Sequence, residues 1–293
     1  MIENILTLDN VIGKGHELPS LPEIYLRVSE QLENEEISAQ QIGNTVQNDP
    51  AITARVLKMV NSAYYGLPNQ VSSVAQAVAL LGRERLRHIL IGSLLRGVFT
   101  GNDNPAYSMQ EFWQHSIKTA IIARQLAQSI ESIEEPESMF TAGLLHDIGK
   151  LVLINRVPEK MLAAEEWMIR KRVDVLTAEL NQVGMTHTAV SEALMRHWGL
   201  PSVLIDCARN HHESVHDGPN RQATHLIYLA NRLSEYVPPI DDQETRDILD
   251  DIENWGMSQL SLEQIAEACQ QADDMVFEVM ESLGMVAIEI SDD

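Results

Sequence analysis

The sequence predicts an all-α protein, and three observations support that prediction. Apolar residues recur at helical spacing along most of the chain, strand-like alternation is nearly absent, and Ser or Thr residues precede many apolar segments as helix N-caps do. With 293 residues, 44% of them hydrophobic, the chain is long enough for one large helical domain or two smaller ones. We therefore expect a helical protein with a substantial apolar core.

Three helix starts in the first hundred residues are predicted from the capping-box pattern, in which Ser is followed three residues later by Glu or Gln. The pairs are Ser20 with Glu23, Ser38 with Gln41, and Ser73 with Gln76. Pro22 and Pro50 stand in first helical turns, where a missing N–H costs little. The segments end at Gly66, at Gly82, or in the stretch 101–105. That stretch is the best boundary, which gives an N-terminal lobe of residues 1–104.

The next segments predict a second helical unit, residues 105–238. Ser108 with Glu111 opens a helix that carries His115, and a helix from Glu137 onward carries His146 and Asp147. Thr186 precedes a helix that Gly199 and Pro201 end. Two further helices follow, at 201–212 and 220–236.

Residues 239–293 are predicted to form an acidic linker and a last amphipathic helix. Ser261 and Gln264 are its capping box. Its apolar stripe consists of Leu262, Ile265, Cys269, Ala272, Val276, Val279 and Leu283. Such a stripe is either part of the core or the interface of a homodimer.

The charge balance excludes some partners. Acidic residues outnumber basic residues 43 to 21, a formal net charge of −22, so the surface repels nucleic-acid phosphates and anionic lipids. The basic cluster Arg83, Arg85, Arg87 and His88 is interpreted as a solvated helix face. Two cysteines cannot build a disulfide framework, no charged start followed by an apolar stretch marks the N-terminus as a signal peptide, and no apolar run is long enough to span a bilayer. We expect a cytoplasmic protein that contacts no membrane.

The adjacent pair His146 and Asp147 is the most informative chemical feature, because imidazole and carboxylate are two ligand types for one metal ion. His115 lies upstream and His187, His211 and His212 lie downstream, each in a helical segment. This set predicts a buried di-metal site in a helical bundle. The alternative is that the histidines are ordinary packing or surface residues, which is our interpretation of His16, His88, His197, His216 and His225.

Several phrases of the first half carry a family resemblance. They are Leu18–Pro22 (LPSLP), Asp49–Leu57 (DPAITARVL), Asn61–Gly66 (NSAYYG) and Val74–Gly82 (VAQAVALLG). In this order they resemble the HDOD domain, the signalling branch of the HD metal-dependent phosphohydrolase superfamily. The resemblance extends from about Leu18 to Tyr236. It implies a helical N-terminal lobe packed on an HD-type helical bundle, in a bacterial protein that regulates signalling.

The same resemblance implies a ligand series for one or two divalent ions of iron, manganese, zinc or nickel. His115, His146, Asp147, His187, His211 and His212 match that series in order, and Asp147 would bridge two ions. The final carboxylate is missing, because Asn231 stands at its position. An amide is a poorer ligand than a carboxylate, so one metal position should be weakened. Lys150 would face the same cavity and neutralise a bound phosphate.

Two functions follow from this altered site. The favoured one is a non-catalytic signalling module whose N-terminal lobe and metal cavity bind a protein partner or a small phosphate-containing ligand. The alternative is a metal-dependent phosphohydrolase or cyclic-dinucleotide phosphodiesterase with a reduced site, in which Asp147 and Lys150 are the catalytic residues. The segment 211–219 lacks the Gly-Tyr-Pro loop of the cyclic diguanylate hydrolases, which argues against catalysis.

Overall fold

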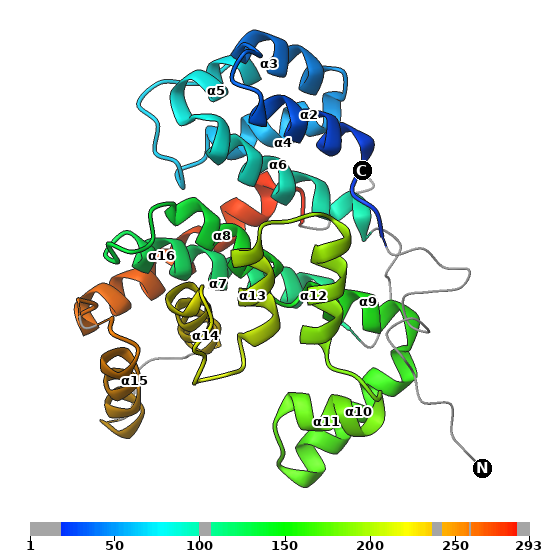
Figure 1. The fold of residues 1–293 in the computed structure, drawn as a ribbon, viewed down its shortest axis with the longest axis vertical. Helices are drawn as coiled ribbons and strands as arrows, with labels where there is room; N and C mark the ends of the chain where they lie inside the picture. The colour runs from blue at the N-terminus through cyan, green and yellow to red at the C-terminus, as the bar shows by residue number, and fades with distance from the viewer. Residues whose placement is uncertain (1–18, 100–106, 236–241, 258, 286–293) are drawn as a thin grey trace, which may run out of the picture.

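Helices form all the regular secondary structure in the part of the chain that the computed structural model describes, residues 19–99, 107–235, 242–257 and 259–285. The all-α prediction is confirmed for these residues. An N-terminal lobe lies at one end of the long axis and a larger helical bundle occupies the rest (Figure 1). Among the helices described, none is long and apolar enough to cross a membrane.

The N-terminal lobe contains α2 (Glu23–Glu33), α3 (Ala39–Gln47), α4 (Pro50–Val60), α5 (Val74–Leu81) and α6 (Arg83–Val98). Ser38 and Gln41 form the predicted capping box of α3, and the Ser73 side chain caps α5. The capping box predicted at Ser20 is wrong, since α2 begins after Pro22 without a side-chain cap. The segment ending at Gly66 also stops earlier than predicted, because α4 ends at Val60 and a turn follows.

Three residues of the basic cluster on α6, namely Arg83, Arg87 and His88, are not on a solvated face, contrary to the sequence interpretation, whereas Arg85 is exposed as expected. The Arg83 guanidinium donates to backbone carbonyls at and after the end of α2, including those of Gln31 at 3.0 Å and Asn34 at 3.1 Å. Arg87 bonds to Glu33 at 3.0 Å, and the His88 side chain is buried. These residues fasten α6 to α2, because the donors satisfy carbonyls that the helix end leaves unpaired.

The bundle is built around α7. Its helices are α7 (Met109–Ala127), α8 (Pro136–Leu145), α9 (Ile148–Arg156), α10 (Pro158–Lys171), α11 (Val175–Gln182), α12 (His187–His197), α13 (Ser202–Asn210) and α14 (Arg221–Ser234). Helix α7 packs on α8 and α14. It approaches α8 closely because Gly143 has no side chain: a Cβ there would lie 2.6 Å from the Ala120 Cα.

Two tyrosines of the lobe contact a buried ion pair of the bundle. The Arg124 Nε on α7 donates to Glu137 Oε1 on α8 at 2.7 Å, and the Tyr65 hydroxyl donates to the other oxygen of Glu137 at 3.3 Å. The Arg124 guanidinium also lies over the Tyr64 ring, 4.5 Å from its centroid. Tyr64 and Tyr65 belong to the turn after α4. The predicted packing of an N-terminal lobe on a helical bundle is thus confirmed, and charged and aromatic groups fix its position.

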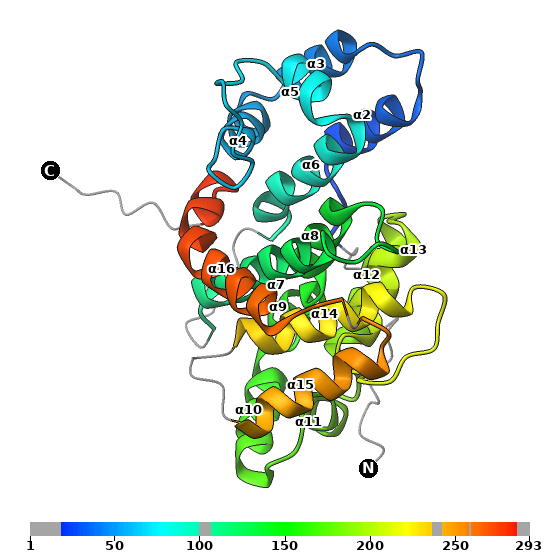
Figure 2. The ribbon, with the colours of Figure 1, turned by 90° about the vertical axis from the view of Figure 1, so that its left-hand side faces the viewer.

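Two helices follow the bundle, α15 (Asp242–Asn254) and α16 (Leu262–Ser282). Helix α16 has the predicted Ser261 and Gln264 capping box and packs on both α7 and α4 (Figure 2). Most of its stripe, including Ile265, Val276 and Val279, is buried in the core of this chain. The boundaries predicted near residues 104 and 238 lie outside the described residues.

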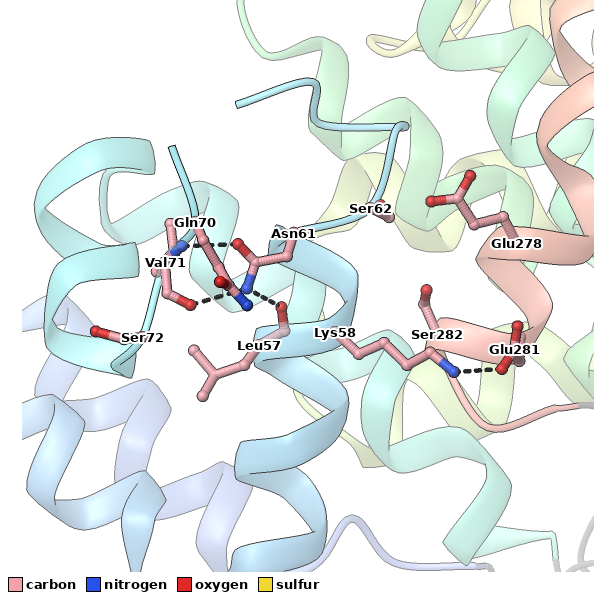
Figure 3. Close-up of a pocket in the computed structure, with 10 residues that line it drawn as sticks. All are labelled: Leu57, Lys58, Asn61, Ser62, Gln70, Val71, Ser72, Glu278, Glu281 and Ser282. Carbon is pink, nitrogen blue, oxygen red and sulfur yellow. Dashed lines mark hydrogen bonds and ion pairs between the residues drawn. The ribbon is translucent and has the colours of Figure 1, made fainter. Parts of the chain in front are cut away.

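The contact between α16 and the N-terminal lobe surrounds a cavity of about 620 Å³. Figure 3 shows Lys58 on α4 reaching Glu281 on α16, with 2.6 Å between Nζ and Oε1. The Asn61 side chain closes the end of α4 by bonding to the backbone of Val71 and Leu57. The last helix therefore connects the lobe to the bundle on a second side.

Candidate metal centre

Helix ends bring the predicted ligands together. His146 is the C-cap of α8 and Asp147 the N-cap of α9, so the chain turns a corner at this pair. His187 is the first residue of α12, and His211 is the C-cap of α13 with His212 directly after it. His115 alone lies in the middle of a helix, α7. All six side chains lie close together in two groups that meet at Asp147.

These side chains form two groups that share Asp147. One group contains Asp147, His187, His211 and His212, and the other contains His115, His146 and Asp147. Asp147 Oδ1 lies 3.1 Å from His187 Nε2 and 3.2 Å from His211 Nε2. Asp147 Oδ2 lies 3.4 Å from His146 Nε2 and 3.6 Å from His115 Nε2. Each carboxylate oxygen thus faces its own set of imidazoles, as in a carboxylate that bridges two ions.

Hydrogen bonds fix which ring nitrogen faces the centre. The Nδ1 of His146 donates to the Gly143 carbonyl at 2.6 Å, and the Nδ1 of His211 donates to the Ala208 carbonyl at 2.9 Å. The Nδ1 of His187 lies 2.8 Å from the buried carboxylate of Glu179. These partners only accept, so in the neutral rings the proton is on Nδ1 and the Nε2 lone pair points inward.

His115 is oriented in the same way through Ser234. The Ser234 hydroxyl donates to the Asn231 carbonyl at 2.7 Å, which leaves its oxygen to accept from His115 Nδ1 at 3.0 Å. The Nε2 atoms of His115 and His146 then face each other at 3.2 Å. Two inward lone pairs at that separation have no proton between them in the neutral tautomers. A cation is the group that would stabilise them.

The spacing of the first group suits a transition metal. The Nε2 of His187 lies 3.3 Å from that of His211 and 3.2 Å from that of His212. Four ligands at about 2.0–2.1 Å from a tetrahedral ion are roughly 3.3 Å apart. Asp147 Oδ1 is also a buried atom without a hydrogen bond. The residues present therefore fit a divalent ion of the zinc, iron, manganese or nickel type.

The protonation states suit metal binding as well. Burial lowers the pKa of His115 and of His212 to about 3, and lowers the pKa of His211 well below its ordinary value. Burial acts to raise the pKa of Asp147, but Lys150 and the imidazoles hold it well below its usual range. The pKa of His187 is raised, because Asp147 and Glu179 outweigh burial and Lys150. Metal at His187 therefore competes with a proton.

Asn231 lies beside the second group. Its side chain on α14 is 9% exposed, and its Oδ1 is a buried atom without a hydrogen bond of good geometry, although it lies close enough to His115 to favour that ring's charged form. The amide carries no charge. The His115 and His146 half of the centre thus has one carboxylate, Asp147.

Lys150 bonds to the bridging carboxylate. Its ammonium lies 2.6 Å from Asp147 Oδ2, the oxygen that faces His115 and His146. Beyond it a cavity of about 650 Å³ opens, lined at this end by Lys150, Glu179, His212 and Asn231. A small ligand in this cavity would meet the ammonium and the metal ligands together.

The sequence reasoning missed three residues that position the ligands. Glu179 accepts from both the backbone N and the Nδ1 of His187, Ser234 orients His115, and Ser191 bonds to the backbone on both sides of the His146 corner. Glu179 was detectable as a carboxylate eight residues before His187, on an otherwise apolar helix face. The two serines carry no such signal, because Ser is common in helices that need none of these contacts.

Gly149 sets the distance between α9 and α12. A Cβ at this position would lie 2.1 Å from the His187 carbonyl oxygen and 2.6 Å from the Ser191 backbone N. We expect Gly149→Ala to destabilise the fold by about 2–3 kcal/mol and to weaken metal binding, because α12 carries His187. Urea unfolding and metal titration measure the two effects. Gly97→Ala, where a Cβ meets nothing within 4 Å, is the matched control. Equal stability of the two variants would contradict this account.

Comparisons with known proteins agree with the fold and the resemblance. The family model of the HDOD domain matches residues 18–214. A crystal structure of an HDOD domain protein with unknown function from Geobacter sulfurreducens has a TM-score of 0.72 at 24% identity, covering 93% of this chain and 94% of its own. One from Shewanella amazonensis, named "Putative phosphohydrolase", has a TM-score of 0.73 at 22% identity, covering 92% and 95%. At these identities the structures show the fold alone.

Two further relatives are longer than this chain. A structure from Marinobacter aquaeolei, named "Putative signal transduction protein", has a TM-score of 0.69 at 24% identity, and the match covers 92% of this chain but 59% of the other. An uncharacterised protein of Treponema pallidum is 26% identical over 209 residues, which is 71% of this chain and 40% of that protein. The chain thus spans less than half the length of the curated relative it matches.

Proposed function

Because the chain belongs to the HDOD family, we propose that it is a signalling module that binds one divalent metal ion and a small phosphate-containing ligand without hydrolysing it. The metal would be held by Asp147, His187, His211 and His212. This group offers one carboxylate and three imidazoles, and its Nε2 atoms already face one another. When bound, the ion would supply positive charge to an anionic ligand.

The other half of the centre supports the single-metal proposal. It has His115, His146 and Asp147 Oδ2, and Asn231 adds no negative charge. The Lys150 ammonium lies 2.6 Å from Oδ2 and supplies a positive charge there. A second dication would be repelled by that ammonium or would have to displace it. Asp147 is the one carboxylate that would offset the positive charge there. The proposal rests on these two facts together: Asn231 carries no charge, and Asp147 Oδ2 is already bonded to Lys150.

One ion supports binding better than hydrolysis. Two-metal phosphoesterases stabilise the attacking and the leaving oxygen with separate ions. In this chain His187, His211 and His212 would hold a metal ion on one side of Asp147. On the other side lies the Lys150 ammonium, a fixed positive charge that cannot activate water. We therefore favour ligand binding that alters contacts with a protein partner. The two cysteines are unpaired, and we propose the cytoplasm as the compartment.

Asn231→Asp tests this function. We expect the metal content to rise from about one ion per chain to about two, and phosphodiesterase activity on bis-p-nitrophenyl phosphate to appear where the parent has none, because the added carboxylate completes the second half. Elemental mass spectrometry of anaerobically purified protein measures the first effect. Asn48→Asp, on the exposed end of α3, is the charge-matched control. Two ions in the parent would refute the single-metal proposal.

A phosphohydrolase is the second candidate function. The observation in its favour is that the Nε2 atoms of His115 and His146 both point toward the centre. With Asp147 they give the second group three metal ligands, beside a cavity large enough for a small substrate. Turnover by the parent that His146→Ala abolishes would establish this alternative. Absence of turnover at full metal occupancy would favour the signalling module.

A further inference from the structure

The cavity beside the metal centre has two chemically different ends. It is formed by residues of α7, α9, α10, α11 and α14 together with His212. Lys150, Glu179, His212 and Asn231 make its inner end, whereas apolar side chains of α9, α10 and α11 make much of its wall. A volume of about 650 Å³ is typical of a site for a small organic ligand.

We propose that this cavity binds a soluble alkyl phosphate monoester, with the phosphate at the inner end and the alkyl chain along the wall. This inference rests on the proposed metal site and specifies its ligand. It does not require that the ester bond is broken.

With a divalent ion bound, the inner end would suit an anion, because the ion would add positive charge beside Lys150, which Asp147 already pairs. The Lys150 side chain is 27% exposed and directs its ammonium to the junction of metal centre and cavity. Asn231 is 9% exposed, and its Oδ1 is a buried atom without a hydrogen bond of good geometry. A phosphate at this point would pair with the ammonium.

The wall is built for an aliphatic chain. Its apolar members on α9, α10 and α11 are Leu151, Ile154, Met161, Ala164, Met168, Ile169, Val175 and Ala178. Met168 and Val175 are partly exposed and Ile169 is 74% exposed, so they keep apolar surface that an alkyl chain could cover. Two members of the wall are methionines, whose flexible side chains adapt to a chain-like ligand. A sugar or nucleobase in this position would lose hydrogen bonds to water that these side chains cannot replace.

The rim of the cavity favours a single phosphate. Glu111, Glu165 and Glu235 line the cavity and are exposed, so their carboxylates surround its mouth. The one arginine of the lining, Arg232, is already paired with Asp251 at 3.1 Å. A ligand with a second phosphate near the mouth would meet like charges, whereas a monoester keeps its charge at the inner end.

The cavity wall includes α11, the helix that orients the metal ligand His187. Helices α10 and α11 form a hairpin that packs on the rest of the bundle chiefly through α9, at the end of the molecule farthest from the N-terminal lobe (Figure 1). The α11 residue Glu179 lines the cavity and holds His187 Nδ1 at 2.8 Å. An alkyl chain against this hairpin would therefore contact both α10 and the helix that orients His187.

Calorimetric titration of the metal-loaded full chain with inorganic phosphate, butyl phosphate and octyl phosphate tests the proposal. Each methylene buried against the wall should tighten binding about two- to four-fold, so octyl phosphate should bind at least about 20-fold more tightly than butyl phosphate. Equal affinity for all three anions would overturn the alkyl-chain inference and leave the proposed metal-and-phosphate site standing. Failure of all three to bind would overturn both.

Two variants locate the chain and the phosphate. Met168→Glu should reduce the affinity for octyl phosphate to that for inorganic phosphate, while Leu162→Glu, on the same helix but outside the lining, should leave the 20-fold preference intact. Lys150→Met should weaken the binding of all the anions by a similar factor, when it is compared with the parent at matched metal content. Equal loss in both glutamate variants, or binding to phosphatidic acid vesicles without binding of octyl phosphate, would refute the site.

Discussion

Replacement of His187 by Ala is expected to remove the metal from the protein, with content falling from about one ion per chain to below one tenth. His187 Nε2 is the common neighbour of the first group, 3.1 Å from Asp147 Oδ1, 3.3 Å from His211 Nε2 and 3.2 Å from His212 Nε2. Removing one of four ligands should weaken affinity by more than the roughly 10- to 100-fold lost when a supporting hydrogen bond is removed. Elemental mass spectrometry of protein purified without chelators measures the content.

Two other variants serve as an intermediate case and a control for this experiment. Glu179→Gln keeps all four ligands but replaces the carboxylate that accepts from His187 Nδ1, so we expect an intermediate loss of affinity of about 10- to 100-fold. His197→Ala removes an exposed histidine of the same helix and should change nothing. Circular dichroism checks that each variant is folded. Full metal content in folded His187→Ala protein would show that this group is not the metal site.

Glu137→Gln is expected to destabilise the protein by roughly 3–5 kcal/mol, because it leaves the charge of Arg124 without its buried partner. The Glu137 side chain is 2% exposed and accepts from Arg124 on one oxygen and from Tyr65 on the other. The amide cannot offer two acceptor oxygens or a compensating charge. Equilibrium unfolding in urea, monitored by circular dichroism, measures the loss.

The exposed pair between Lys58 and Glu281 is the matched control for that prediction. This pair joins the N-terminal lobe to α16, and its side chains are 48% and 66% exposed. Glu281→Gln should therefore cost no more than about 1 kcal/mol. If the two glutamate variants lose equal stability, burial is not what makes the Arg124 contact important. Arg124→Met with Glu137→Met should recover part of the loss, since both charges are then absent.

Local features of the fold were predictable from the sequence because they depend on nearby residues. Ser38, Ser108 and Ser261 cap helices as predicted, since each side chain bonds to a backbone N–H three residues away. Ser20 fits the same pattern but does not cap, because α2 begins after Pro22. Arg83 and Arg87 were misinterpreted for a different reason: their acceptors lie about fifty residues away.

The sequence by itself determined the helical class, the family and the order of the histidines and Asp147, because periodicity, caps and motifs are written along the chain. The tertiary structure alone decided that these side chains face one point, that Lys150 bonds to Asp147 Oδ2, and that a cavity with an apolar wall opens beside them. Helix packing sets these relations. The close approaches at Gly143 and Gly149 fix distances between helices that no local pattern encodes.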